Sequence, residues 1–152
     1  MKAPAIDILP SLRGVVVDES AVTDKLGKFN DEPSVHTRRP VPAEAKYPMV
    51  VIGPIITRGN EDGINSFRPI LVIDVTIYGE QPAGYRDVEL IAETIYGLFH
   101  MQRHAFTVPN YSVVNVTATG PTPAPVKAGP GDDESRVGRR VTLTIRLYAP
   151  NR

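Results

Sequence analysis

The most regular pattern of apolar and polar positions lies in residues 69–78, where every second residue is aliphatic. A period of two is typical of a β-strand, because successive side chains point to opposite faces of a sheet. One face of this segment is fully apolar, whereas the other mixes aliphatic, acidic and hydroxyl side chains. We therefore predict a central strand that is covered on one side. Its covered face would consist of Leu71, Ile73, Val75 and Ile77.

A helical pattern follows the turn-forming residues 79–84. Apolar side chains now recur at intervals of three and four, which places them on one stripe of an α-helix. Acidic residues gather near the start of this segment and basic residues near its end, as the helix dipole favours. We predict that the stripe packs onto the apolar face of the strand. It comprises Tyr85, Val88, Ile91, Ala92, Ile95, Leu98 and Phe99.

Weaker patterns predict the remaining elements. A helix should begin near Ile8 or Leu9, because Pro10 is tolerated only in a first turn, and a short second helix should cover Glu19–Leu26. The apolar run 47–56 predicts a buried strand, in which Pro54 must lie at an edge or a bulge because it donates no ladder hydrogen bond. Two further strands are predicted at 106–118 and 141–147.

Two long segments show no usable period. Residues 28–46 form a proline-rich link that contains Arg38 and Arg39. Residues 119–135 are rich in proline and glycine, and we interpret them as a mobile loop or arm. A structureless link of this length inside one domain is uncommon and is often functional or wrapped on a neighbour.

These elements predict one α+β domain over residues 1–152, with long loops or arms. We expect a four-stranded antiparallel or mixed sheet with the helices packed on one face. The predicted sheet core consists of Val51, Leu71, Ile73, Val75, Ile77, Leu143, Ile145 and Leu147, covered by Val88, Ile91, Ile95 and Phe99.

Composition excludes several classes of function. Lys plus Arg and Asp plus Glu number 17 each, so no overall charge attracts the chain to nucleic acid or to a membrane. The chain has no cysteine, which excludes disulfides and thiolate metal sites. We see no secretory signal or apolar run long enough to span a bilayer, so we expect a protein made in the cytoplasm.

Candidate chemistry is sparse. His100 and His104 could share one helix face and chelate a metal, but no third ligand is evident, so we interpret them as cationic residues at a helix end. No phosphate-binding loop, dinucleotide fingerprint or nucleophile elbow is present. We therefore expect no enzymatic activity and no cofactor.

Charged residues fall into a few groups. Asp74 lies in an apolar strand, where Arg140 or Arg146 could pair with it. Two acidic clusters lie in glycine-rich loops and match no calcium-binding pattern. We interpret the clusters as solvated, and we take them with the basic pair of the link as candidate interface residues. The candidates are Arg38, Arg39, Glu61, Asp62, Asp132, Asp133 and Glu134.

Several apolar motifs and their order resemble a known family. The strand opening 47–53 (YPMVVIG), the strand end 75–79 (VTIYG), the helix 92–99 (AETIYGLF) and the last strand 141–147 (VTLTIRL) resemble the tail-terminator, or tail-completion, proteins of long-tailed bacteriophages. The resemblance covers most of the chain in element order. The link at 28–46 and the loop at 119–135 depart from the pattern.

The resemblance implies a virion protein of the tail or neck, without catalysis. It implies a homohexameric ring that caps the tail tube, ends tube polymerisation and joins the tail to the head connector or stopper protein, with the tail sheath as a further possible neighbour. DNA would pass through the ring without specific binding. The alternatives are another neck or baseplate component, or a small metal-binding protein or enzyme that uses His100 and His104.

The two long segments should lie at contacts between subunits or rings. The link carries Arg38 and Arg39, and the loop carries Asp132, Asp133 and Glu134, so their charges are complementary. Proline-restricted segments lose less conformational entropy on docking than flexible ones do. Complementary charge would fix the register between copies more than it would add affinity.

Overall fold

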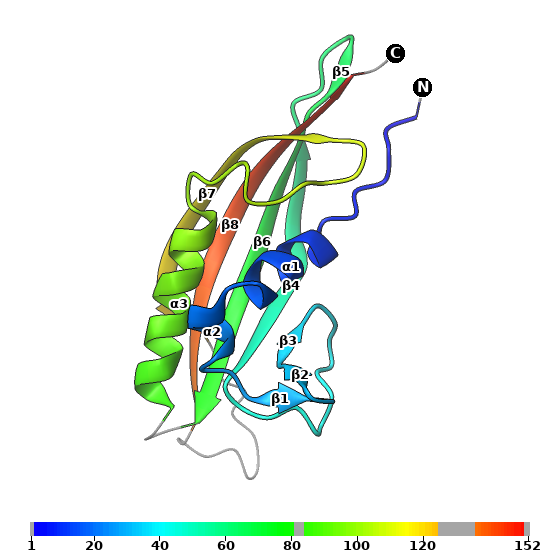
Figure 1. The fold of residues 1–152 in the computed structure, drawn as a ribbon. Coiled ribbons are helices and arrows are strands. Elements are labelled where there is room, and N and C mark those ends of the chain that lie inside the picture. Colours follow the sequence, from blue (N-terminus) through cyan, green and yellow to red (C-terminus); the bar gives the residue numbers. More distant parts are fainter. Residues whose placement is uncertain (1, 81–83, 125–135, 151–152) are drawn as a thin grey trace.

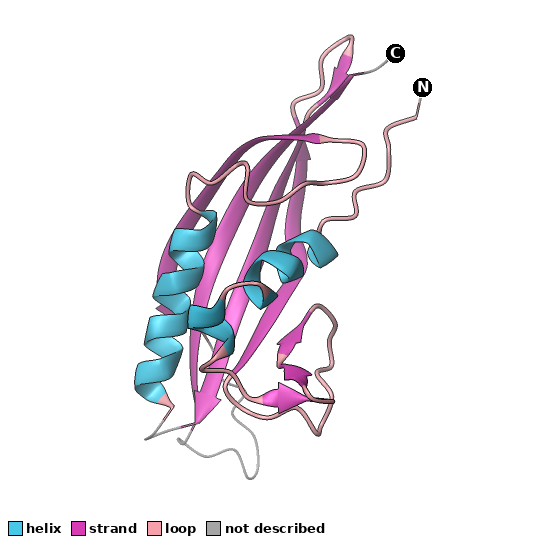
Figure 2. Ribbon diagram, viewed as in Figure 1, coloured by secondary structure: helices cyan, strands magenta, loops and turns pink. Residues whose placement is uncertain are grey.

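A computed structural model describes residues 2–80, 84–124 and 136–150. In these residues, a six-stranded sheet contains four long strands in the order β4–β6–β8–β7 (Figures 1 and 2). These are β4 (Met49–Asn60), β6 (Pro69–Glu80), β8 (Arg136–Pro150) and β7 (Ser112–Pro123), and each adjacent pair is antiparallel. The predicted α+β class is confirmed, although the sheet has two more strands than we expected.

Two short strands complete the six-stranded sheet, and two others form a separate hairpin. β3 (Val35–His36) pairs in parallel with the start of β4, and β5 (Ser66–Phe67) pairs with the end of β8. β1 (Lys28–Phe29) and β2 (Glu32–Pro33) form a separate small hairpin. The interpretation of residues 28–46 as structureless is therefore wrong for 28–36. Strands of two residues are too short to show a period, and pairing with β4 decides their position.

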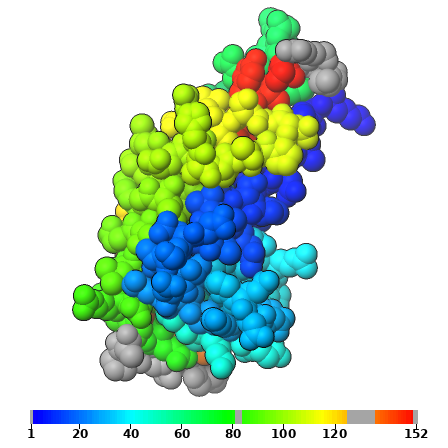
Figure 3. Space-filling model, in the orientation of Figure 1, coloured from blue at the N-terminus to red at the C-terminus, as the bar shows by residue number. Residues whose placement is uncertain are grey.

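All three helices lie on one face of the sheet (Figure 1), and with residues 100–111 they cover much of the near face in the space-filling view (Figure 3). They are α1 (Leu9–Val17), α2 (Ser20–Thr23) and α3 (Tyr85–Phe99). α1 has its proline in the first turn. α3 spans the predicted apolar stripe but ends at Phe99, before the basic residues that we expected near its end. α2 is shorter than predicted, and the Glu19 carboxylate caps it by accepting the Ala21 N–H (3.4 Å). No helix in the described residues is long and apolar enough to cross a membrane.

The predicted core is buried as expected, with one residue on the wrong face. The apolar face of β6 and the stripe of α3 from Val88 to Phe99 contribute to one cluster with the inward residues of β8. Tyr85, which we placed first in the stripe, is exposed instead. Val51 is buried but pairs with Thr76, whose side chain lies on the opposite face from Val75 and Ile77. Val50 and Ile52 occupy the helix side instead, because they pair with Ile77 and Val75. In an apolar run without alternation, the sequence does not indicate whether the odd-numbered or the even-numbered residues face the helices.

β7 differs from its prediction at both ends. It begins at Ser112 rather than Phe106 and continues to Pro123, so residues 119–123 belong to a strand and not to a loop. An irregularity between Val113 and Asn115 leaves Val114 half-exposed and moves Val113 to the helix side. A bulge adds one residue to one strand, which reverses the faces that simple alternation predicts.

Gly79 allows α3 to approach β6 closely. A Cβ atom at this position would lie 2.3 Å from Cγ2 of Val88, the first fully buried residue of the α3 stripe. Either the Val88 side chain or the helix that carries it would have to shift to accommodate a Cβ atom at this position. This close approach starts the helix directly over the end of the strand that precedes it.

Candidate assembly surfaces

The two histidines considered as metal ligands do not share a helix face. α3 ends at Phe99, so the spacing of four residues between His100 and His104 is not helical. His104 Nε2 instead accepts a hydrogen bond from Arg103 Nε (3.2 Å). Within the described residues, no group of three or more His, Cys, Asp or Glu side chains could hold a metal ion.

His100 covers part of the outer edge of β7. Its Nδ1 accepts the backbone N–H of Ala118 (3.1 Å), while the N–H of Met101 donates to the carbonyl of Val116 (2.9 Å). The imidazole also stacks on Tyr96, with ring centroids 4.9 Å apart. Because Nδ1 is an acceptor here, the proton of the neutral ring is on Nε2. The N–H of Ala118 and the carbonyl of Val116, which an added strand would need as partners, are therefore already hydrogen-bonded within the chain.

The opposite edge of the sheet is irregular. β3 pairs with only Val50 and Val51 of β4. Beyond that point the register of β4 shifts between Ile52 and Ile55 and again between Ile55 and Thr57. Pro54, predicted at an edge or bulge, lies in the first shift and has no N–H to donate. Bulges and edge prolines are devices that prevent open-ended strand addition.

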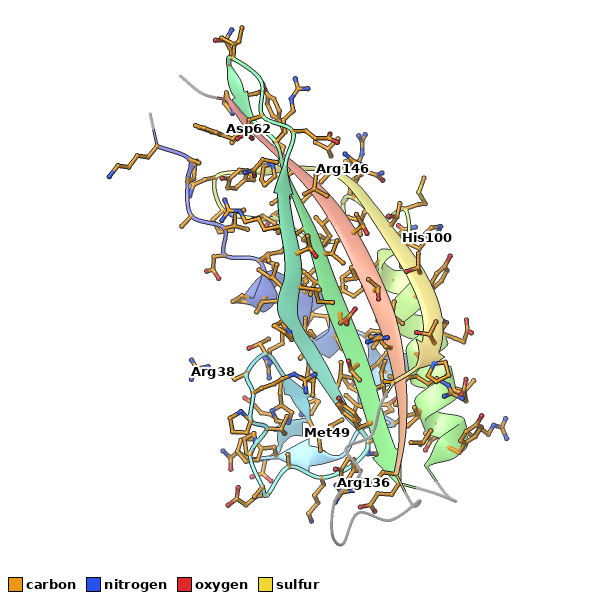
Figure 4. All side chains as sticks on the ribbon, turned by 180° about the vertical axis from the view of Figure 1, so that it is seen from behind. Arg38, Met49, Asp62, His100, Arg136 and Arg146 are labelled. Carbon is orange, nitrogen blue, oxygen red and sulfur yellow. The ribbon has the colours of Figure 1, made fainter. Side chains whose placement is uncertain are left out.

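The face of the sheet away from the helices carries polar and charged side chains (Figure 4). The hydroxyl of Thr142 donates to Asp74 Oδ1 (2.7 Å), and Arg140 Nη1 lies 3.6 Å from Asp74 Oδ2. The predicted pairing of Asp74 with Arg140 is confirmed. Arg146 pairs instead with Glu61 (2.9 Å). The exposed pair of Arg146 with Glu61 contributes at most about 1 kcal/mol.

Glu61 and Asp62 lie on a hairpin that projects beyond the sheet near both termini (Figure 1). We call residues 61–65 the hairpin tip. Gly63 and Ser66 exchange two backbone hydrogen bonds (3.0 and 3.4 Å) around a two-residue turn, and Asp62 Oδ1 accepts the N–H of Arg68 (2.7 Å). Ile64 lies in this turn with 94% of its surface exposed.

Arg38 and Arg39 are exposed and form no ion pair with any described residue. Arg38 lines a groove of about 330 Å³, which we call the proline groove. Arg13 enters it from α1, where its Nε donates to the carbonyl of Val35 (3.0 Å). The groove lining is completed by Phe29, Glu32, Pro33, Val35, His36, Thr37, Pro40 and Pro42.

The surroundings of His36 in the proline groove shift its pKa. Its Nε2 lies 2.7 Å from the hydroxyl oxygen of the buried Ser34, and its ring meets Phe29 edge-on at 5.8 Å. Burial, and secondly the nearby positive charge of Arg13, lower the pKa of His36 below its usual value. The groove therefore favours the neutral form of this imidazole.

The arginines near the C-terminus are mostly engaged within the chain. Arg139 pairs with Glu89 and donates to the Tyr85 hydroxyl (3.0 Å), so it joins β8 to the start of α3. The guanidinium of Arg136 lies over the ring of Tyr47, 5.4 Å from its centroid. Both guanidinium groups therefore take part in contacts within the chain.

The candidate interface residues lie in separate places. Asp62 lies at the projecting end and Arg38 in the other half of the molecule (Figure 4). Asp132, Asp133 and Glu134 lie outside the described residues. Their pairing with Arg38 and Arg39 therefore stays a prediction.

The sequence patterns did not identify Ile64 as a surface residue of the hairpin tip or His100 as a residue that covers the β7 edge. Ile64 is a single apolar residue inside a turn of Gly, Asn and acidic residues, and that isolation was the available signal. His100 gave no signal for its actual contact, because its partner Ala118 is 18 residues away and the two meet only in the folded chain.

Comparisons with known proteins indicate the fold. No family model matches the sequence, and no curated protein matches it. Among solved structures, a chain of the virion of a native gene transfer agent (GTA) particle is similar, with a TM-score of 0.68. The match covers 93% of this chain and 92% of that chain at 11% sequence identity. This chain therefore shares its fold, over nearly its whole length, with a component of a virion particle.

Proposed function

We propose that this protein is a structural component of a phage-like virion, and that it caps the tail tube as a homo-oligomeric ring. The observation that carries the proposal is the fold shared with a chain of the gene transfer agent virion, because the match spans nearly all of both chains. The motifs that resemble tail-terminator proteins support the same role from the sequence. The ring ends tube polymerisation and joins the tail to the head connector.

The edges of the sheet suit a protein that ends a polymer. A terminator must bind the last ring of a tube without offering an equivalent surface for another. The edge of β7 is partly covered by His100 and Met101, and the edge of β4 is interrupted by two register shifts. Neither edge presents a long regular ladder, so assembly would use the faces and projections of the molecule.

The first test is the state of the purified protein. Electron microscopy, with mass measured by light scattering, should reveal closed rings of defined size. Adding purified tube protein should then yield tubes that stop growing when this protein is present. Tubes that grow equally long with and without it would contradict the capping role.

A second test locates the protein in particles. Gold-labelled antibody should bind at the junction of head and tail. Label at the far end of the tail would indicate a baseplate component instead, and particles without label would contradict a virion location.

A further inference from the structure

The hairpin tip has the properties of a preorganised docking element. Its two-residue turn is closed by backbone hydrogen bonds, and the Asp62 carboxylate fixes its base by accepting from Arg68. β5, directly after the tip, pairs with Ala149 and Pro150 in the register that β6 keeps with β8. A segment held in this way loses little conformational entropy when it binds.

Ile64 gives this element an apolar end. With 94% of its surface exposed, it is the most exposed of the large hydrophobic residues in the described chain. Most exposed aliphatic side chains need no explanation, because protein surfaces are largely apolar. Ile64 differs because a hydrogen-bonded turn holds it in an exposed position, two residues after Asp62.

The proline groove is complementary to the tip in chemistry. Phe29 and three prolines supply apolar lining, and the basic residues Arg13 and Arg38 stand beside them. Arg39 adds a further exposed positive charge next to the groove, while Glu32 is its acidic member. Arg13 pairs with Glu32 (3.6 Å), so the positive charge of the groove comes from Arg38, whereas Glu61 pairs with Arg146 (2.9 Å), so the negative charge of the tip comes from Asp62. An apolar side chain that follows an acidic residue in one turn fits an apolar depression beside an arginine.

The tip cannot reach the groove of its own chain. The tip is fixed by strand pairing at the projecting end, whereas Arg38 lies in the other half of the molecule (Figure 4). A contact between two different patches of identical chains is heterologous, and it generates a closed ring when the rotation closes.

We propose that the hairpin tip of one copy docks into the proline groove of the next, with Ile64 against the prolines and Asp62 toward Arg38. This inference rests on the proposed self-assembly and names the contact that would build the ring. Asp62 forms no ion pair among the described residues, so its charge is available to a partner.

The absence of cysteine from the chain permits a direct test by disulfide crosslinking. A variant with Ile64→Cys and Thr37→Cys places one thiol at the tip and one in the groove lining. Mild oxidation of the assembled protein should give a ladder of covalent oligomers that ends at the number of subunits in the ring. Ile64→Cys alone should stay uncrosslinked. The matched control, Leu90→Cys with Thr37→Cys, places the first thiol on an exposed residue of α3 and should give no ladder.

A second variant measures the contribution of the apolar contact. Ile64→Ser should weaken self-association about 10- to 100-fold, as expected for exposing one buried isoleucine. Sedimentation over a range of concentrations would measure this. Leu90→Ser should leave self-association unchanged, and at concentrations low enough for monomers both variants should keep the unfolding midpoint of the natural protein.

The possible results separate this inference from the proposed function. Dimers formed by Ile64→Cys alone would indicate a tip-to-tip contact and overturn the inference. Rings that form normally from Ile64→Ser, with no ladder from the double-cysteine variant, would also overturn it while leaving the capping ring in place. A protein that stays monomeric at all concentrations would overturn it too, and antibody labelling of particles would then decide the virion role independently.

Discussion

Phe99 tests most directly whether α3 holds the sheet together. It is the last residue of α3 and is fully buried in the core cluster. Its ring meets the ring of Phe106 edge-on, with centroids 6.1 Å apart. Because Phe106 lies in the segment that leads to β7, this pair connects the end of the helix to the next strand.

Truncation at this position should have a large effect on folding. Phe99→Ala should lower the free energy of unfolding by about 3–5 kcal/mol, from the lost transfer of the ring and the cavity left behind. Phe99→Leu keeps an apolar side chain but loses the aromatic contact, so it should cost about 1–1.5 kcal/mol. Domains of this size have only about 5–15 kcal/mol of stability, so the alanine variant should be close to marginal.

Urea denaturation followed by circular dichroism would measure these differences. With an m-value of about 2 kcal/mol/M, Phe99→Ala should shift the midpoint by roughly 1.5–2.5 M. The neighbouring half-buried Leu98 provides the control, and Leu98→Ala should cost about 1–2 kcal/mol. Protein concentration must be equal in all samples, because assembly raises apparent stability. A shift for Phe99→Ala no larger than that for Leu98→Ala would refute the packing of α3 on the sheet.

Three further predictions concern single contacts. His100→Ala should speed hydrogen exchange at the Ala118 amide and increase aggregation, whereas His104→Ala should do neither; an unchanged Ala118 exchange rate would show that His100 does not cover this edge. Because the pKa of His36 is lowered in the folded state, stability should be full above the unfolded pKa of about 6.5 and should fall as the pH drops toward and through the lowered value. Urea midpoints between pH 5 and 8 should show this slope, and His36→Gln should lose it; an equal slope in both proteins would assign the effect to other groups. Gly79→Ala should cost about 1–3 kcal/mol, and adding Val88→Ala should cost less than the sum of the two single changes, because the added Cβ meets Val88; a strictly additive double-mutant cycle would contradict that contact.

The partly covered edge of β7, the irregular edge of β4 and the projecting tip would all limit how copies of the chain associate under the proposed function. Long regular strands at a sheet edge accept any compatible strand, and such pairing can continue without limit. This chain has a histidine and a register irregularity at the β7 edge, and a proline with two register shifts at the β4 edge. Association through a specific side-chain contact is limited by geometry instead, which is the requirement for a ring that closes.

The sequence by itself determined the elements whose periods are long. Alternation over residues 69–78 and the helical stripe from Tyr85 to Phe99 specified β6 and α3, and with them the buried faces that join the two. The mixed faces of two strands also limited the partners of Asp74 to Arg140 or Arg146, and the structure decided for Arg140. The periods of β6 and α3 depend on local spacing, which the order of residues states directly.

Only the tertiary structure decided the features that depend on distant partners. It placed Val51 on the face opposite the helices and extended β7 to Pro123, because register and bulges are set by pairing between strands. It turned His100 from a possible metal ligand into a partner for the amide of Ala118. It also separated Glu61 and Asp62 from Arg38 and held Ile64 outward on a rigid turn. Position along the chain does not state these relations, because each depends on which segments the buried core brings together.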